Sequence, residues 1–175
     1  YVYECYLWDN IAATCFREVD GALYFGTADG KLCRFNTDIE GMTRYNDDGA
    51  AIVAIMRTKF DDDGAPQMLK TLQKRGSSVT VKPYTRSSAK IAVRTEQDTI
   101  PREIAFEYKD IFSWEDIDFN RFTFNSNDAP QDIYLNTKVK HYKRLQFTVV
   151  NDAVNEGFGI FQIVKNYTVD KLAKR

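Results

Sequence analysis

Apolar and polar residues alternate with a period of two along several stretches of this chain, and this pattern constrains the fold more than any other feature. Ile91, Val93 and Thr95 alternate with charged or small neighbours, and residues 144–149 repeat the pattern. Such alternation turns every second side chain toward a core and is typical of half-buried β-strands. Roughly ten candidate strands follow one another at the spacing of a sandwich or barrel. We therefore expect an all-β protein.

Three segments depart from simple alternation. Residues 159–164 are apolar on both faces apart from Gln162, which predicts a central strand. Residues 67–74 fit a short helix or a strand, and the neighbouring strands favour a strand. Near the end of the chain, residues 169–174 are compatible with a short terminal helix.

The first 40 residues differ from the rest. They contain four short candidate strands, over residues 3–8, 12–18, 22–26 and 31–35. Four short antiparallel strands make one propeller blade, and a single blade cannot bury both of its faces alone. Because the chain also opens inside a candidate strand, we expect further sequence upstream. The sequence thus predicts the remnant blade of a β-propeller over residues 1–40, followed by a β-sandwich-like domain over residues 41–175.

Composition excludes several classes of protein. A formal net charge of −1 argues against a general nucleic-acid binder. No apolar run approaches the roughly 18 residues of a membrane helix. Cys5, Cys15 and Cys33 are an odd number without a C-x-x-C pair, which argues against a disulfide framework or a zinc site. We expect them to be reduced, mostly buried thiols of a protein made in the cytoplasm.

Charge is distributed in blocks of alternating sign. Residues 1–63 carry a net charge of −6, residues 64–95 of +7, residues 96–132 of −7 and residues 133–175 of +5. Opposite blocks can pair within one chain, or they can form complementary faces between identical subunits. For the second case we predict an assembly surface that sets basic residues of the second block against acidic residues of the third: Lys74, Arg75, Lys82, Arg86 and Lys90 against Asp110, Glu115, Asp116 and Asp118.

A search for reactive groups gives little. His141 is the only histidine, and it lies among lysines and arginines without a nucleophile motif elsewhere. Residues 61–64, three aspartates and a glycine, can hold a hard cation but lack the ligand spacing of an EF-hand and are typical of a solvated turn. We predict no catalytic residue, no metal site and no cofactor.

The segment around Trp114 leaves three interpretations open. Its Asp and Asn residues are typical of turns. We expect Trp114 to be part of the core, in which case Trp114→Ala should cost about 3–5 kcal/mol. If it is exposed, Trp114 and the many tyrosines, with Trp8, can form a platform for sugars. As a third possibility, Glu115 and Asp118 can be the two carboxylates of a hydrolase.

Six strings spread over the chain resemble virion structural proteins of phages and prophages from Gram-positive bacteria. They are LWDNIAA at 7–13, LYFGTADGKLCRF at 23–35, TRYNDDG at 43–49, KPYTRSS at 82–88, WEDIDF at 114–119 and NDAVNEGFG at 151–159. The layout that this resemblance implies, propeller blades followed by a β-rich C-terminal domain, is loosely similar to the tail hub and nozzle proteins of short-tailed phages.

The resemblance implies a non-enzymatic virion structural protein of the tail or neck, made in the cytoplasm of a bacterial host and located in the virion. Its expected partners are other virion proteins and copies of itself. DNA contact is expected only if the basic face lines a channel, and membrane contact is not expected. A carbohydrate-binding or adhesion module is the alternative function.

Overall fold

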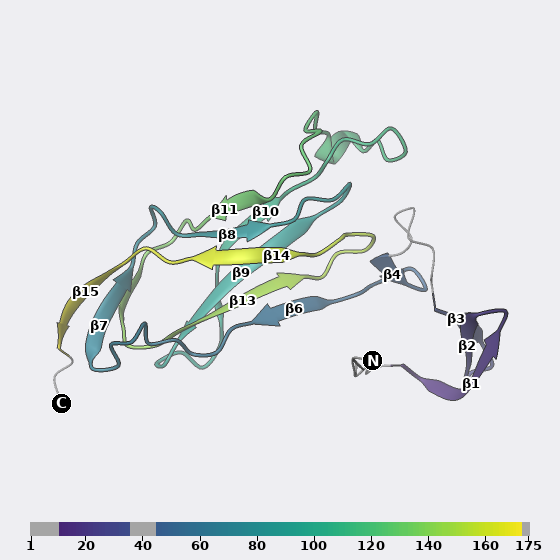
Figure 1. Cartoon of the computed structure of the whole chain (residues 1–175), viewed down its shortest axis with the longest axis horizontal. Coiled ribbons are helices and arrows are strands. Elements are labelled where there is room, and N and C mark those ends of the chain that lie inside the picture. The colour runs from purple at the N-terminus through teal and green to yellow at the C-terminus, as the bar shows by residue number, and fades with distance from the viewer. Residues whose placement is uncertain (1–10, 36–44, 173–175) are drawn as a thin grey trace, which may run out of the picture. The chain divides into compact units, whose positions relative to one another are not determined.

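The computed structural model describes residues 11–35 and 45–172. The chain divides into two compact units, Tyr1–Arg44 and Tyr45–Arg175, and both are built from antiparallel strands (Figure 1). The expectation of an all-β, sandwich-like protein is therefore confirmed. The second unit also contains a single turn of 3-10 helix, η2 (Phe119–Arg121).

The first unit holds three strands in the order β1-β2-β3: β1 (Ala13–Val19), β2 (Ala22–Thr27) and β3 (Leu32–Arg34). Gly21, with a φ of 78°, completes the tight turn between β1 and β2. The Phe25 ring lies 6.1 Å from Phe16 and 5.2 Å from Phe35, which gives this small sheet an aromatic face. Residues 3–8, the other strand expected in a blade, lie outside the described residues, so the propeller remnant stays a prediction.

The second unit begins with a short hairpin, β4 (Asn46–Asp47) and β5 (Ala50–Ala51). Its larger sheet has the order β10-β9-β13-β6. The strands are β10 (Arg102–Tyr108), β9 (Ser88–Thr95), β13 (Leu145–Asn151) and β6 (Ala54–Arg57). The alternation read from the sequence is present in β9 and β13, where Ile91 pairs with Val149 and both side chains are fully buried.

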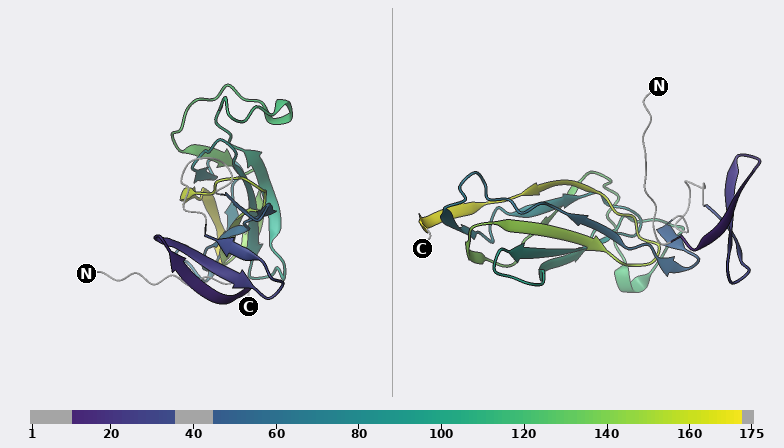
Figure 2. Two further views of the ribbon diagram at one scale, coloured as in Figure 1. Left: turned by 90° about the vertical axis from the view of Figure 1, so that its right-hand side faces the viewer. Right: turned by 90° about the horizontal axis from the view of Figure 1, so that it is seen from below.

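The opposite layer is made of two three-stranded sheets in matching order, β11-β8-β14 and β12-β7-β15. Their strands are β7 (Met68–Leu72), β8 (Ser78–Val81), β11 (Gln131–Tyr134), β12 (Val139–Tyr142), β14 (Ile160–Val164) and β15 (Tyr167–Leu172). The chain runs directly from β7 to β8, from β11 to β12 and from β14 to β15. The two sheets are therefore halves of one long layer with a break across its middle (Figures 1 and 2).

Side chains hold the break together where the strand ladder stops. The Ser77 hydroxyl donates to the Gln73 carbonyl at 2.8 Å and accepts from the Asn166 backbone N–H at 3.0 Å. The Gln73 N–H in turn donates to the Asn166 carbonyl at 2.7 Å. These bonds satisfy backbone groups that would otherwise be left unpaired beside the core.

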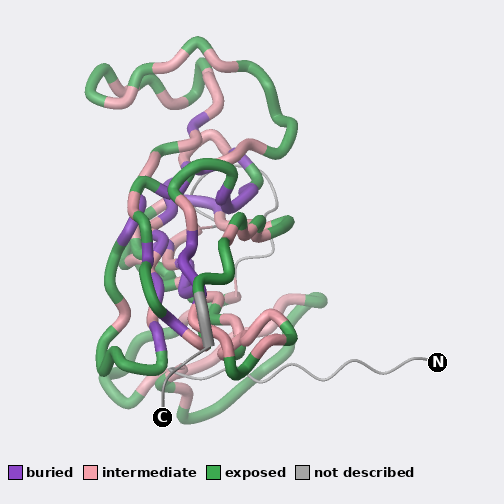
Figure 3. Tube along the Cα trace, turned by 90° about the vertical axis from the view of Figure 1, so that its left-hand side faces the viewer, coloured by how far each residue is buried: buried purple, intermediate pink, exposed green. Residues whose placement is uncertain are grey.

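One hydrophobic core lies between the two layers, and both layers contribute to it. It includes Leu72, Val79, Ile133 and Tyr142 from the broken layer, and Ile91, Phe147 and Val149 from the four-stranded sheet. The buried segments in Figure 3 accordingly follow the strands of the sandwich, whereas the loop that follows β10 is almost wholly exposed or half-buried.

The structure confirms one local expectation from the sequence and corrects three others. The segment 67–74 does form a strand, β7, as favoured. The segment 159–164 is not a central strand, because β14 pairs only with β8 and the Phe161 side chain is 60% exposed. The terminal helix is wrong too, since residues 167–172 form β15. Cys15 is exposed and Cys33 half-buried, which contradicts the expectation of mostly buried thiols for Cys15.

Candidate functional site

The long connection between β10 and β11, residues 109–130, extends beyond the sandwich at one end of the second unit (Figure 2). Short polar side chains shape it by accepting hydrogen bonds from backbone N–H groups two residues further along. Asp118 caps η2 in this way through the Asn120 N–H at 2.8 Å, and Thr123, Asn125 and Asn127 do the same for the turns that follow. This is the turn chemistry that the Asp and Asn content predicted.

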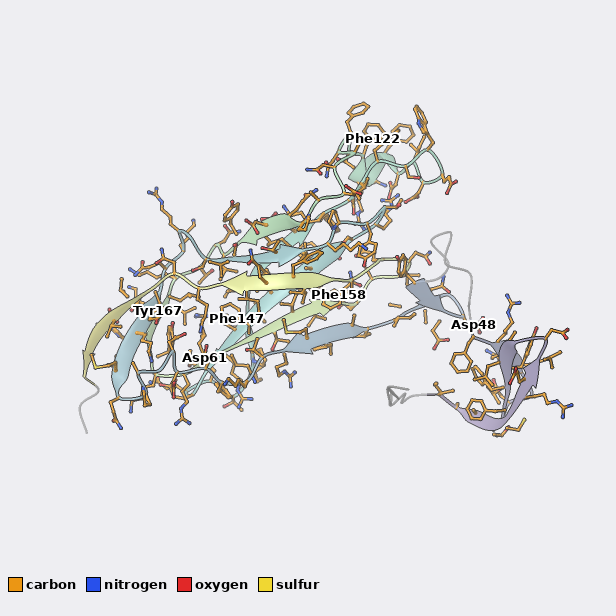
Figure 4. The ribbon with its side chains drawn as sticks, in the orientation of Figure 1. Asp48, Asp61, Phe122, Phe147, Phe158 and Tyr167 are labelled. Atoms are coloured by element: carbon orange, nitrogen blue, oxygen red, sulfur yellow. The ribbon has the colours of Figure 1, made fainter. Side chains whose placement is uncertain are left out.

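Five aromatic rings project from this loop, and we call them the aromatic tip: Phe112, Trp114, Phe119, Phe122 and Phe124. The side chains of Trp114, Phe119 and Phe124 are 82%, 86% and 83% exposed. This corrects the expectation of a core position for Trp114. Figure 4 shows the rings clustered around Phe122, away from the sandwich. Contiguous exposed apolar groups of this kind mark interaction surfaces.

Three ring pairs pack edge to face, and two pairs, Phe112–Phe124 and Phe119–Phe122, are stacked with interplanar angles of 29° and 17°. Phe112 and Trp114 have ring centroids 4.9 Å apart at 80°, and Phe122 and Phe124 have centroids 4.7 Å apart at 89°. These are favourable aromatic geometries, which hold the rings in a defined cluster even though water surrounds them. Because three of these pairs have nearly perpendicular ring planes, the five rings do not share one plane, and the cluster is a knob rather than a flat platform.

Charged side chains fasten the base of the loop to the sandwich. Arg121 donates to both carboxylate oxygens of Asp110, at 3.0 and 2.7 Å, and also forms an ion pair with Glu156. The guanidinium of Arg121 lies 4.0 Å from the centroid of the Tyr108 ring, which adds a cation–π contact. Desolvation opposes the charge of Arg121, but its hydrogen bonds to Glu156 and Asp110 raise its pKa.

Both carboxylates that hold Arg121 are themselves held by the sandwich. Asp110 accepts from the Ser87 backbone N–H at 2.9 Å. Glu156, only 6% exposed, accepts from the Asn151 side-chain amide at 2.8 Å and from the Ser88 hydroxyl. A buried charge is tolerated only where it is paired and hydrogen-bonded in this way.

A second arginine holds the middle of the loop. Arg86 forms a two-pronged ion pair with Asp116, one of its hydrogen bonds measuring 2.8 Å, and lies 3.4 Å from Asp118. The hydrogen bond from Arg86 holds the pKa of Asp116 below its ordinary value, because it favours the ionised carboxylate. We call Arg86, Asp110, Asp116, Arg121 and Glu156 the ion-pair anchor.

The structure gathers part of the predicted assembly surface at this loop. Arg86, Asp110, Asp116 and Asp118 meet there within one chain, and Glu115 is exposed beside them. The others lie elsewhere. Lys90 pairs with Asp152 at 2.6 Å, Lys82 lies 5.1 Å from the Tyr84 ring centroid, and Lys74 and Arg75 are exposed in the β7–β8 turn, at the break in the broken layer. The role of these residues between subunits stays a prediction.

Sequence reasoning missed the four phenylalanines of the aromatic tip, as well as Arg121 and Glu156. One signal was present in the sequence. Residues 109–130 are rich in aromatics but show no alternation and are interrupted by Asp and Asn, which is the pattern of a loop rather than a strand. The pairing of Arg121 with Glu156 joins positions 35 residues apart and left no trace in the local sequence.

Other candidate groups have ordinary surroundings. His141 is exposed in β12. Lys165 forms ion pairs with Asp61 and Asp63, so a side-chain ammonium occupies the place that a cation would take in that turn. Over residues 11–35 and 45–172, the structure groups no three His, Cys, Asp or Glu side chains in a way that could hold a metal ion.

No helix in the described part of the chain has the length and apolarity to cross a membrane. Comparison with known proteins found no matching family model, no matching curated protein and no matching solved structure.

Proposed function

We propose that this chain is a non-enzymatic structural component of a phage or prophage virion, in the tail or neck, and that it docks on a neighbouring virion protein through the aromatic tip. The observation that carries the proposal is the exposure of Trp114, Phe119 and Phe124 on a loop that buried ion pairs fix in place. The six family-like strings support the virion assignment.

Docking by this loop follows from its physical properties. Trp and other aromatic residues supply much of the binding energy in protein interfaces when they enter an apolar pocket. Because the ion-pair anchor and the ring contacts order the loop in advance, binding does not have to pay for that order. Five acidic residues against two basic ones give residues 109–130 a net charge of −3, which disfavours DNA phosphates as the ligand.

Purified phage particles provide the test of this proposal. Mass spectrometry of purified, nuclease-treated particles from the encoding host should find the chain at a constant copy number. In the same particles, Trp114→Ala/Phe124→Ala should reduce incorporation, whereas Phe161→Ala, which removes a 60% exposed ring from β14, should not. Absence of the chain from particles that are otherwise complete would refute the proposal.

A carbohydrate-binding module is the second candidate, and the 82% exposure of Trp114 favours it. A sugar ring stacks on the flat face of an aromatic side chain, and the five rings of the tip do not form one flat surface, so the tip fits a polysaccharide less well than a protein pocket. Titration of the chain with purified host cell-wall polysaccharide, followed by tryptophan fluorescence in a Trp8→Phe background, decides between the two. Saturable quenching of Trp114 fluorescence by the polysaccharide would favour the sugar.

A further inference from the structure

The break across the broken layer of the second unit carries unpaired positive charge at its surface. Lys74 and Arg75 are exposed in the β7–β8 turn, and Lys138 and Lys140 are exposed at the start of β12. The register pair Val139 and Leu72 brings the start of β12 beside the end of β7, so the four cations gather at the break between the two halves of the broken layer. We call them the basic end. Within the part of the chain that the structure describes, none of the four forms an ion pair.

The basic end also offers apolar surface. Tyr134, at the end of β11, has a side chain that is 58% exposed. It lies at the same break in the layer, because Leu135 donates its backbone N–H to the Ser77 carbonyl. Lysine and arginine side chains add long hydrocarbon stems and can approach the faces of aromatic rings. This surface therefore suits a partner that is both aromatic and acidic.

The aromatic tip is such a partner. The two arginines that hold the loop of the aromatic tip, Arg86 and Arg121, each pair with two carboxylates, so they leave no positive charge in excess. Glu115 and Asp128 are exposed beside the rings. The loop thus presents a negatively charged aromatic knob, while residues 73–78 and 134–144 together contain six basic residues and no acidic one.

We infer that the neighbour on which the aromatic tip docks is a second copy of this chain, and that its basic end receives the tip. This inference rests on the proposed function of the tip as a docking element. Because the tip and the basic end are different surfaces of one chain, copies join head to tail, and every copy can bind one neighbour through each surface. Contact between two tips is disfavoured, since it would bring like charges together.

Two variants of the full 175-residue chain test this arrangement by sedimentation velocity. One lacks the rings, Trp114→Ala/Phe119→Ala/Phe124→Ala, and the other reverses the basic end, Lys138→Glu/Lys140→Glu. Each variant alone should self-associate roughly tenfold or more weakly than the wild type. An equimolar mixture should form dimers and nothing larger, because one intact tip and one intact basic end remain in each pair.

The control is Arg57→Glu/Lys59→Glu, which makes the same charge change at exposed positions of and beside β6 and should associate as the wild type does. High salt should weaken wild-type association. Full association of the Lys138→Glu/Lys140→Glu variant would overturn the inference, as would a mixture that fails to form dimers.

The particle experiment distinguishes a failure of this inference, the second copy as partner, from a failure of the proposed docking role of the tip. A wild-type chain that stays monomeric at all concentrations, combined with loss of the ring variant from particles, would overturn the second copy as partner while leaving the docking role intact. Incorporation of the ring variant at the wild-type level would instead refute the docking role itself.

Discussion

The interior of the sandwich and the loop at its end use the same residue types in opposite ways. In β13, Leu145, Phe147 and Val149 are buried against the opposite layer, and the alternate residues Gln146 and Val150 are half-buried. In residues 109–130 the aromatic rings face water, while Asp110, Arg121 and the neighbouring Glu156 are enclosed. The sandwich folds by removing apolar surface from water, whereas charged hydrogen bonds shape the loop.

This difference separates two tasks within one unit. Residues that stabilise the sandwich cannot also meet a partner, because they are covered by the other layer. In the loop, the ion-pair anchor provides order, and the rings are left available for contact. Stability and docking should therefore respond to different substitutions.

The largest effect is expected in the sandwich. Phe147→Ala removes a ring that is 2% exposed and should lower the free energy of unfolding by about 3–5 kcal/mol, through lost burial and a cavity. Denaturant titration followed by circular dichroism measures this. A change as small as that of a surface substitution would mean that the two layers are not packed as described.

The second-largest effect on stability is expected when the ion-pair anchor loses its central cation, Arg121. Arg121→Met leaves Asp110 and Glu156 without their counter-charge and should cost about 3 kcal/mol. Hydrogen exchange should show the loss of protection first at Ser87 and within residues 109–130, with β9 and β13 still protected. Arg57→Met, at an exposed position of β6, is the control and should change neither quantity. Equal loss of protection throughout the sandwich would contradict a separate role for the anchor.

A smaller effect should appear with pH. The pKa of Asp116 is lowered by its hydrogen bond to Arg86, so the folded loop gains stability while this carboxylate is ionised. That gain is complete above the ordinary aspartate pKa of about 4 and is lost as the pH falls through the lower pKa of the folded state. Trp114 fluorescence in the Trp8→Phe background should change in this acid range. Asp116→Asn should remove that transition, and its persistence in this variant would assign the change to another carboxylate.

The smallest effect on stability is expected at the most exposed rings. Trp114→Ala should change the free energy of unfolding by less than about 0.5 kcal/mol, because its side chain has little to lose in folding. The same denaturant titration as for Phe147→Ala provides the comparison. A cost of several kcal/mol would place Trp114 in the core after all and remove the aromatic tip as a docking surface.

Regular alternation made the sandwich strands predictable. The sequence around Ile91 and Phe147 shows which side chains face the core, because a strand with one covered face must alternate. The same rule failed for residues 159–164. An apolar run predicts burial on both faces, but β14 lies at the edge of its sheet and leaves Phe161 exposed.

The site was harder to predict because its geometry depends on distant pairs. Acidic and basic blocks were visible in the sequence, but no local pattern indicates that Arg86 meets Asp116 or that Arg121 meets Glu156. Trp114 was expected in the core because large aromatic residues usually are buried. Only the structure shows that charged groups take the covered positions in this loop.

The ion-pair anchor has a consequence for how such a protein can diversify. Because the rings contribute little to folding, mutations at Trp114, Phe119 and Phe124 do not destabilise the protein. Selection can therefore act on their effect on binding alone. Lineages could thus exchange the tip residues for new neighbours while Arg121, Asp110 and Glu156 are retained. We therefore expect the sequences of relatives of this chain to vary at the ring positions and to be invariant at the anchor positions.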